Sequence, residues 1–114
     1  MSSITRNELK ELLDSGEKVS LVDALPLNYY AEGHIPGAIS LPPGRVAELA
    51  PALLPDKERP VVVYCSSSIC QNSAITAEVL RNLGYADVRR YAEGKEDWKA
   101  AGLPLEKLTQ SSAG

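Results

Sequence analysis

The 114-residue sequence predicts an α/β fold, with a mainly parallel central sheet and helices on both of its faces. Short apolar runs rich in β-branched residues alternate with segments in which apolar residues recur at helical spacing. The run that ends at Cys65 is apolar without interruption, which is typical of a parallel strand buried on both faces. The length suits one core, so we expect a single domain over residues 1–110 and a disordered tail over 111–114.

The N-terminal half begins with a helix. Thr5 and Glu8 have the spacing of a capping box, leucines follow at helical intervals, and Gly16 ends the helix. Apolar spacing predicts another helix over 46–54, in which Pro51 causes a break or a late start. Three short elements lie between these helices: a strand over 19–22, a helical turn over 28–32 and a strand over 38–41.

The C-terminal half begins with the strand over 60–64, at the centre of the predicted sheet. A helix over 73–83 follows, with Ser73 as its N-terminal cap and Gly84 as its stop. Two elements complete the fold: a strand over 87–91 and a short helix over 97–101.

The composition argues against several classes of protein. The net charge is −3, which does not favour nucleic-acid binding. No apolar run approaches the roughly 20 residues of a membrane span, and the N-terminus lacks an apolar signal core. We therefore expect a cytoplasmic protein without membrane contact. The two cysteines and one histidine are too few for a conventional zinc site, and we expect neither a metal nor a cofactor.

Cys65 directly follows the central strand, and a short polar loop separates it from the next predicted helix. In open α/β sheets, ligand sites lie at the carboxyl ends of the strands. Backbone N–H groups of the loop and the N-terminus of the helix are expected to point toward the thiol and to favour its thiolate form. The sequence therefore predicts a reactive cysteine at this position.

The order and spacing of four motifs resemble those of a single-domain rhodanese, a sulfurtransferase, from about Ile4 to Glu106. The motifs are the strand end Leu21-Val22-Asp23, the segment 33–38, the strand Val62-Val63-Tyr64-Cys65, and a C-terminal part with Gly84, Tyr85, Gly94, Trp98 and residues 101–104. The resemblance implies a rhodanese-like fold.

The resemblance also implies that Cys65 is the catalytic nucleophile of a sulfurtransferase or persulfide carrier. Cys65 would take sulfane sulfur from thiosulfate, a polysulfide or a protein persulfide and pass it to a thiophilic acceptor. Near the site, Asp23, His34 and Ser73 have structural roles: we expect Asp23 to accept N–H bonds from the loop that follows it and His34 to anchor a turn. The substrate-binding loop comprises Ser66, Ser67, Ser68, Ile69, Cys70, Gln71 and Asn72.

The chain departs from the family pattern at the site. Leu25 and Tyr29 stand where the family usually has Arg and Glu, so we expect a more apolar patch there. The loop after Cys65 is two residues longer than usual and lacks the usual Gly and Arg. We therefore expect weak activity toward the thiosulfate dianion. Four arginines can supply charge from elsewhere, but the sequence does not place them: Arg6, Arg45, Arg89 and Arg90.

Cys70 leaves alternatives open. It is either an inert neighbour or a resolving thiol that attacks the Cys65 persulfide, releases sulfide and leaves a disulfide for a thioredoxin-like reductant. It can also accept the sulfur itself. The alternatives to a sulfurtransferase are thus a Cys65/Cys70 redox relay and a non-catalytic interaction module. A phosphatase of the same fold is disfavoured, because Gln71 stands where its oxyanion-binding Arg would be. Both a monomer and a homodimer remain open.

Overall fold

The computed structural model describes residues 2–42, 44–67 and 70–107. Over these residues, five strands form one sheet in the order β1-β5-β4-β2-β3, and every neighbouring pair is parallel. This confirms the predicted α/β class. The strands are β1 (Ser2–Ser3), β2 (Ser20–Asp23), β3 (Ile39–Ser40), β4 (Val61–Tyr64) and β5 (Val88–Tyr91).

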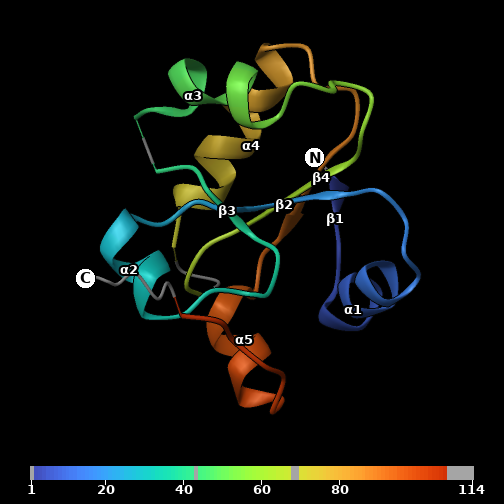
Figure 1. Cartoon of the computed structure of the whole chain (residues 1–114), viewed down its shortest axis with the longest axis vertical. Helices are drawn as coiled ribbons and strands as arrows, with labels where there is room; N and C mark the ends of the chain where they lie inside the picture. Colours follow the sequence, from blue (N-terminus) through green and yellow to red (C-terminus); the bar gives the residue numbers. More distant parts are fainter. Residues whose placement is uncertain (1, 43, 68–69, 108–114) are drawn as a thin grey trace.

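Helices cover both faces of the sheet, as predicted (Figure 1). One face packs against α3 and α4, and the other packs against α1 and α5. The helices are α1 (Arg6–Asp14), α2 (Leu27–Glu32), α3 (Val46–Leu53), α4 (Asn72–Asn82) and α5 (Gly94–Ala100).

The central strand β4 joins two hydrophobic cores. Val61 and Val63 point into the core shared with α3 and α4, whereas Val62 and Tyr64 point into the core shared with α1 and α5. All four side chains are buried. Because both faces of β4 are covered, its sequence is apolar throughout instead of alternating.

Some predicted boundaries are right and others need correction. The capping box at α1 is present, with the Thr5 hydroxyl accepting from the Glu8 N–H and the Glu8 carboxylate accepting from the Thr5 N–H. Helix α3, however, continues through Pro51 without the predicted break. Pro51 and Ala47 are exposed, so water can reach the Ala47 carbonyl whose helical donor the proline removes.

Two further corrections concern helix starts. Helix α5 begins at Gly94, three residues before the predicted start, and brings its first turn against the residue that follows β4. Ser73 does not cap α4: the cap position is Gln71, and the Ser73 side chain is buried inside the first turn. The Ser73 hydroxyl is therefore available to the site described below. Gly84, with a φ of +100°, follows the last turn of α4 as predicted.

The C-terminal segment folds back onto the domain. Trp98 of α5 is buried, and its indole N–H donates to the Pro104 carbonyl at 2.8 Å. The predicted tail over 111–114 lies outside the described residues, and the prediction of one domain over 1–110 stays a prediction. Within residues 2–42, 44–67 and 70–107, no helix has the length and apolar character that crossing a membrane requires.

Candidate active site

Cys65 directly follows the carboxyl end of β4, which is the middle strand of the sheet. Its side chain is only 1% exposed and belongs to the core between the sheet, α3 and α4. The neighbouring strand β2 ends level with β4, since Asp23 pairs in register with Tyr64. The nucleophile predicted from the sequence thus sits at the strand ends where α/β folds form their sites.

The backbone around Cys65 is held by the first turn of α5. The N–H groups of Lys95 and Glu96 donate to the carbonyls of Cys65 and Ser66, both at 2.8 Å. Gly94 makes this contact possible, because a Cβ at that position would stand 2.5 Å from the Cys65 carbonyl oxygen. The φ of Gly94 is +74°, which also favours glycine. The segment after β4 is therefore fixed by a close backbone-to-backbone contact with α5.

The Cys65 thiol makes hydrogen bonds with Cys70 and with Ser73. Its thiol lies 3.4 Å from the Cys70 carbonyl oxygen, to which it donates, and 3.3 Å from the Ser73 hydroxyl oxygen. The Ser73 backbone N–H also points to the sulfur and favours the thiolate, as expected for the start of a helix. Burial nevertheless dominates and raises the pKa of Cys65. Burial thus opposes the ionisation that the sequence predicts, because desolvation of the thiolate outweighs the effect of the helix terminus.

The Cys70 thiol has the N–H donors that were expected around Cys65. Partial burial raises its pKa, but the Cys65 thiol and the backbone N–H groups of Asn72 and Ser66 favour the thiolate and bring the net pKa below that of an ordinary cysteine. Among the described loop residues, the N–H groups of Ser66 and Asn72 therefore favour the thiolate of Cys70. The site holds two adjacent free thiols, one buried and one partly exposed.

The other residues of the predicted loop differ in their surroundings. Ser66 and Asn72 line a cleft beside the site, and the Ser67 carbonyl accepts the Cys70 N–H in a turn at 3.1 Å. Gln71 is exposed at the start of α4. Ser68 and Ile69 lie outside the described residues.

Arg90 of β5 is hydrogen-bonded both to helix α4 and to the loop after Cys65. Its Nε–H donates to the Ser73 hydroxyl oxygen at 2.8 Å, and its Nη2 donates to the Cys70 carbonyl oxygen at 3.3 Å. Sequence reasoning named Arg90 among four arginines without placing it. Strand alternation was the available signal, because consecutive residues point to opposite faces and Arg90 pairs with Val63 on the face of α4.

A cleft of about 620 Å³ opens beside Cys65, between α2 and α5. Leu25 and Tyr29, at the two departures from the family pattern, are both in its wall, in agreement with the expected apolar patch. The cleft also contains charges of both signs, carried by Glu32, Lys95, Glu96 and Lys99.

Asp23, at the end of β2, is buried and accepts hydrogen bonds from two neighbouring segments. One carboxylate oxygen accepts the Leu25 N–H at 2.9 Å, which is the type of loop contact that the sequence predicts. The other accepts the Tyr64 hydroxyl at 2.8 Å, and that hydroxyl in turn accepts the Ile35 N–H. Burial raises the pKa of Asp23. These bonds tie the ends of β2 and β4 to the segment that contains His34.

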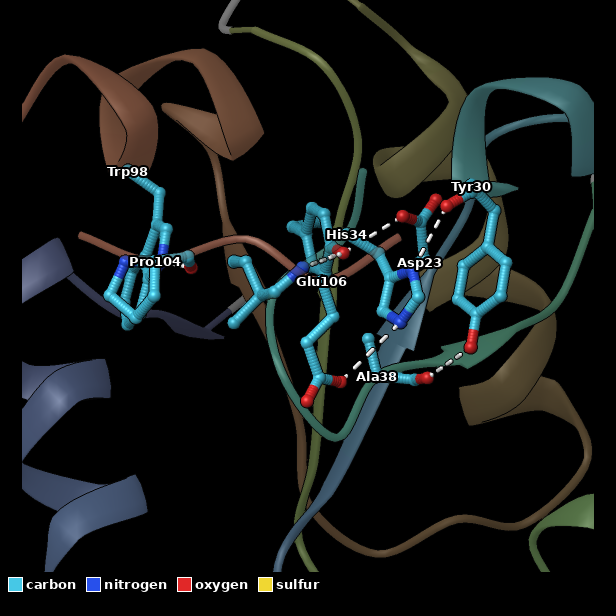
Figure 2. Close-up of polar contacts among 9 residues, drawn as sticks. Asp23, Tyr30, His34, Ala38, Trp98, Pro104 and Glu106 are labelled. Atoms are coloured by element: carbon cyan, nitrogen blue, oxygen red, sulfur yellow. Dashed lines mark hydrogen bonds and ion pairs between the residues drawn. The ribbon is translucent and has the colours of Figure 1, made fainter. Parts of the chain in front are cut away.

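His34 anchors a turn and does not reach the thiols through any hydrogen bond among the described residues. Figure 2 shows its ring beside Tyr30 and Glu106. Nδ1 lies 2.9 Å from the Tyr30 carbonyl oxygen, and because a carbonyl only accepts, Nδ1 is the protonated nitrogen. The ring stacks on Tyr30 at 3.9 Å, and Nε2 lies 3.7 Å from the Glu106 carboxylate. Its geometry is that of a structural residue.

This arrangement coincides with similarity to known proteins. The family model of the rhodanese-like domain matches residues 5–101. The chain is 33% identical over 97 residues to thiosulfate sulfurtransferase GlpE of Coxiella burnetii, covering 85% of this chain and 86% of that protein. The structure of the human single-domain sulfurtransferase TSTD1 superposes with a TM-score of 0.78 at 26% identity, covering 88% of this chain and 96% of that one.

Other relatives are longer proteins. The chain is 36% identical over 105 residues to the HTH-type transcriptional regulator Rv0324 of Mycobacterium tuberculosis, covering 92% of this chain but 45% of the regulator. It is 27% identical over 95 residues to the putative sulfur carrier protein YrkF of Bacillus subtilis, covering 83% of this chain and 49% of that protein. The chain thus spans about half the length of these two curated relatives.

Proposed function

Because this chain belongs to the rhodanese-like domain family, we propose that it is a sulfurtransferase or persulfide carrier with Cys65 as its nucleophile. The observation that carries the proposal is the setting of Cys65 at the end of β4, with the Ser73 hydroxyl and N–H directed at its sulfur. Its relationship to a protein named thiosulfate sulfurtransferase, at 33% identity, supports the same reaction class.

The reaction has two steps. The Cys65 thiolate attacks the outer sulfur of the donor, the donor's S–S bond breaks, and the donor leaves as a thiolate or, from thiosulfate, as sulfite. An acceptor thiolate then attacks the outer sulfur of the Cys65 persulfide, and Cys65 leaves as the thiolate. The buried Cys65 thiol must first lose its proton, which burial opposes, and the Ser73 hydroxyl and backbone N–H offset part of that cost by favouring the thiolate.

The cleft supports a preference among donors. Its wall contains Leu25 and Tyr29, and its lysines are balanced by two glutamates. A dianion gains little in such a neutral, partly apolar cleft, whereas an uncharged or singly charged donor loses less hydration. The proposed donors are therefore an uncharged polysulfide or a protein persulfide, with thiosulfate as a poor substrate.

The test is intact mass after incubation with polysulfide and, separately, with thiosulfate. Native protein should gain one sulfur from polysulfide, and Cys65→Ala should gain none. Cys70→Ser is the matched control, since it removes the other thiol and keeps the nucleophile. The proposal fails if Cys65→Ala gains sulfur as the native chain does, or if no donor modifies the native chain, the result expected of a non-catalytic interaction module.

A second candidate is a dithiol–disulfide relay, and it is favoured by the hydrogen bond from the Cys65 thiol to the Cys70 carbonyl oxygen, which places the two cysteines side by side. The Cys70 thiolate would attack the inner sulfur of the Cys65 persulfide, expel hydrosulfide and form the Cys65–Cys70 disulfide. A thioredoxin-like dithiol would then reduce this disulfide, becoming oxidised itself. A product lighter than the reduced chain by two hydrogens, absent in Cys70→Ser, would support the relay.

A further inference from the structure

One cation touches two of the groups that contact the Cys65 sulfur. Arg90 donates to the Ser73 hydroxyl oxygen at 2.8 Å and to the Cys70 carbonyl oxygen at 3.3 Å. The Cys65 sulfur lies 3.3 Å from that hydroxyl and 3.4 Å from that carbonyl. Because the Arg90 Nε and the Cys65 sulfur share one oxygen as neighbour, they lie within about 6 Å of each other.

The hydrogen bond from Arg90 orients the Ser73 hydroxyl. A hydroxyl has one proton to donate, and the guanidinium of Arg90 can only donate. With a lone pair of Ser73 occupied by Arg90, the Ser73 proton is free to point at the sulfur when Cys65 is ionised. Ser73 is fully buried, so water does not compete for this proton. Two hydrogen bonds in series thus connect the guanidinium of Arg90, through the Ser73 hydroxyl, to the Cys65 sulfur.

The charge of Arg90 is also not neutralised nearby. In the described part of the chain, four other arginines have carboxylate partners, but no carboxylate lies within ion-pair distance of Arg90. Its guanidinium is partly buried, where a charge acts more strongly than in water. The other ionisable groups around the thiol are Cys70 in the loop, Lys95 and Glu96 on α5 and, beyond Tyr64, Asp23 on β2.

We propose that Arg90 is a positioning residue that, through Ser73, stabilises anionic sulfur on Cys65, both as thiolate and as persulfide. This inference rests on the proposed function for its role in turnover. In this proposal, Arg90 on β5 supplies the positive charge that the loop after Cys65 lacks. Arg90 is bonded to groups that contact the sulfur and is not in the wall of the cleft, so it favours ionisation of the nucleophile and does not recruit an anionic donor. That division agrees with the proposed preference for polysulfide over thiosulfate.

The test measures alkylation of Cys65 by iodoacetamide against pH, in the Cys70→Ser background, where Cys65 is the only thiol. No sulfur donor is present, so the result does not depend on the proposed turnover. Arg90→Gln should slow alkylation at neutral pH by about fivefold to tenfold and move the pH midpoint upward, because an opposite charge within about 6 Å favours the thiolate. Arg90→Lys should restore most of the rate.

Arg89→Gln is the matched control. Arg89 is the preceding residue on β5, pairs in register with Val62 on the opposite face, and is bonded to Asp87. Its removal changes net charge equally and should leave the midpoint unchanged. Ser73→Ala is the second variant: it should raise the midpoint while Arg90 is intact, and adding Arg90→Gln should then raise it little further.

Three results would overturn the proposal: an unchanged midpoint in Arg90→Gln, an equal shift in Arg89→Gln, or full additivity of Ser73→Ala with Arg90→Gln. If Arg90→Gln does not fold, Ser73→Ala and Arg90→Lys decide alone, and an unchanged midpoint in Ser73→Ala overturns the proposal. Absence of sulfur uptake with a normal Arg90 effect would instead refute the proposed function and leave the role of Arg90 in ionisation intact.

Discussion

At the scale of single residues, the two thiols differ in exposure and in surroundings. Cys65 is buried, and burial raises its pKa, whereas contacts with Cys65 and with loop N–H groups outweigh the partial burial of Cys70 and lower its pKa. As pH rises, iodoacetamide should therefore modify Cys70 first and Cys65 only at higher pH, because the thiolate is the reactive form. Peptide mapping of the alkylated chain measures this order. Modification of Cys65 before Cys70 would contradict it.

Asp23 provides a second prediction at this scale. Burial raises its pKa above the ordinary value of 3.8, so the folded chain holds this proton more tightly than the unfolded chain does. The stability that Asp23 contributes is then full below that ordinary value and is lost as pH rises through the folded-state pKa. Asp23→Asn cannot titrate, so native protein should lose stability relative to this variant between acidic and neutral pH. Urea unfolding at several pH values measures the difference, and a relative gain by native protein would refute the assignment.

The residues that sequence could identify are those whose chemistry depends on local order. Cys65 follows an apolar run, and Asp23 bonds the N–H two residues after it. Arg90 differs because its role comes from a neighbouring strand and from a helix that begins 18 residues before it. Its neighbour Arg89 has the same side chain and a different function, and only strand register distinguishes the two. The pairing of loop N–H groups with Cys70 likewise depends on how the loop curls.

At the scale of elements, the contact between α5 and the segment after β4 gives a stability prediction. Gly94→Ala adds a Cβ 2.5 Å from the Cys65 carbonyl oxygen. We expect a loss of about 1–2 kcal/mol from the left-handed backbone and a further loss of about 1–3 kcal/mol from the overlap. The free energy of unfolding in urea measures the sum.

Gly102→Ala is the control for that experiment. Gly102 also has a positive φ, of +81°, but nothing lies within 4 Å of an added Cβ. This variant should lose only the conformational part, about 1–2 kcal/mol. Equal losses of unfolding free energy in the two variants would show that the close approach of α5 to the Cys65 carbonyl does not make Gly94→Ala more destabilising.

Elements with strong local signals were predictable, and those that depend on packing were not. Helix α1 has its capping box and α4 has its C-terminal glycine, and both formed near the expected bounds. Strand β1 has only two residues, too few for a periodic pattern, and exists because β5 offers a free edge. Helix α5 begins early because the carbonyls of Cys65 and Ser66 accept its first N–H groups. Such tertiary partners are not visible in local sequence.

At the scale of the whole molecule, one sheet joins two cores. Leu9 is buried in the core beneath α1 and α5, and Leu80 is buried in the core beneath α3 and α4. Leu9→Ala and Leu80→Ala should each lower the free energy of unfolding by about 2–5 kcal/mol. Because β4 contributes side chains to both cores, the two faces should still unfold together.

The single tryptophan makes this cooperativity measurable. Trp98 lies in the core beneath α1 and α5, so its fluorescence reports on that face, whereas far-ultraviolet circular dichroism reports on all helices. In Leu80→Ala, which damages the opposite face, the two urea midpoints should coincide. Separate midpoints would mean that the faces are independent units.

The backbone bonds between α5 and the segment after β4 also have a dynamic consequence. The amide hydrogens of Lys95 and Glu96 can exchange with solvent only when they release the carbonyls of Cys65 and Ser66. Their hydrogen-exchange rates therefore measure how often the backbone of the thiol site opens. Two amides on a helix that contributes no thiol thus become probes of the loop, and they remain readable after the sulfur itself has been blocked.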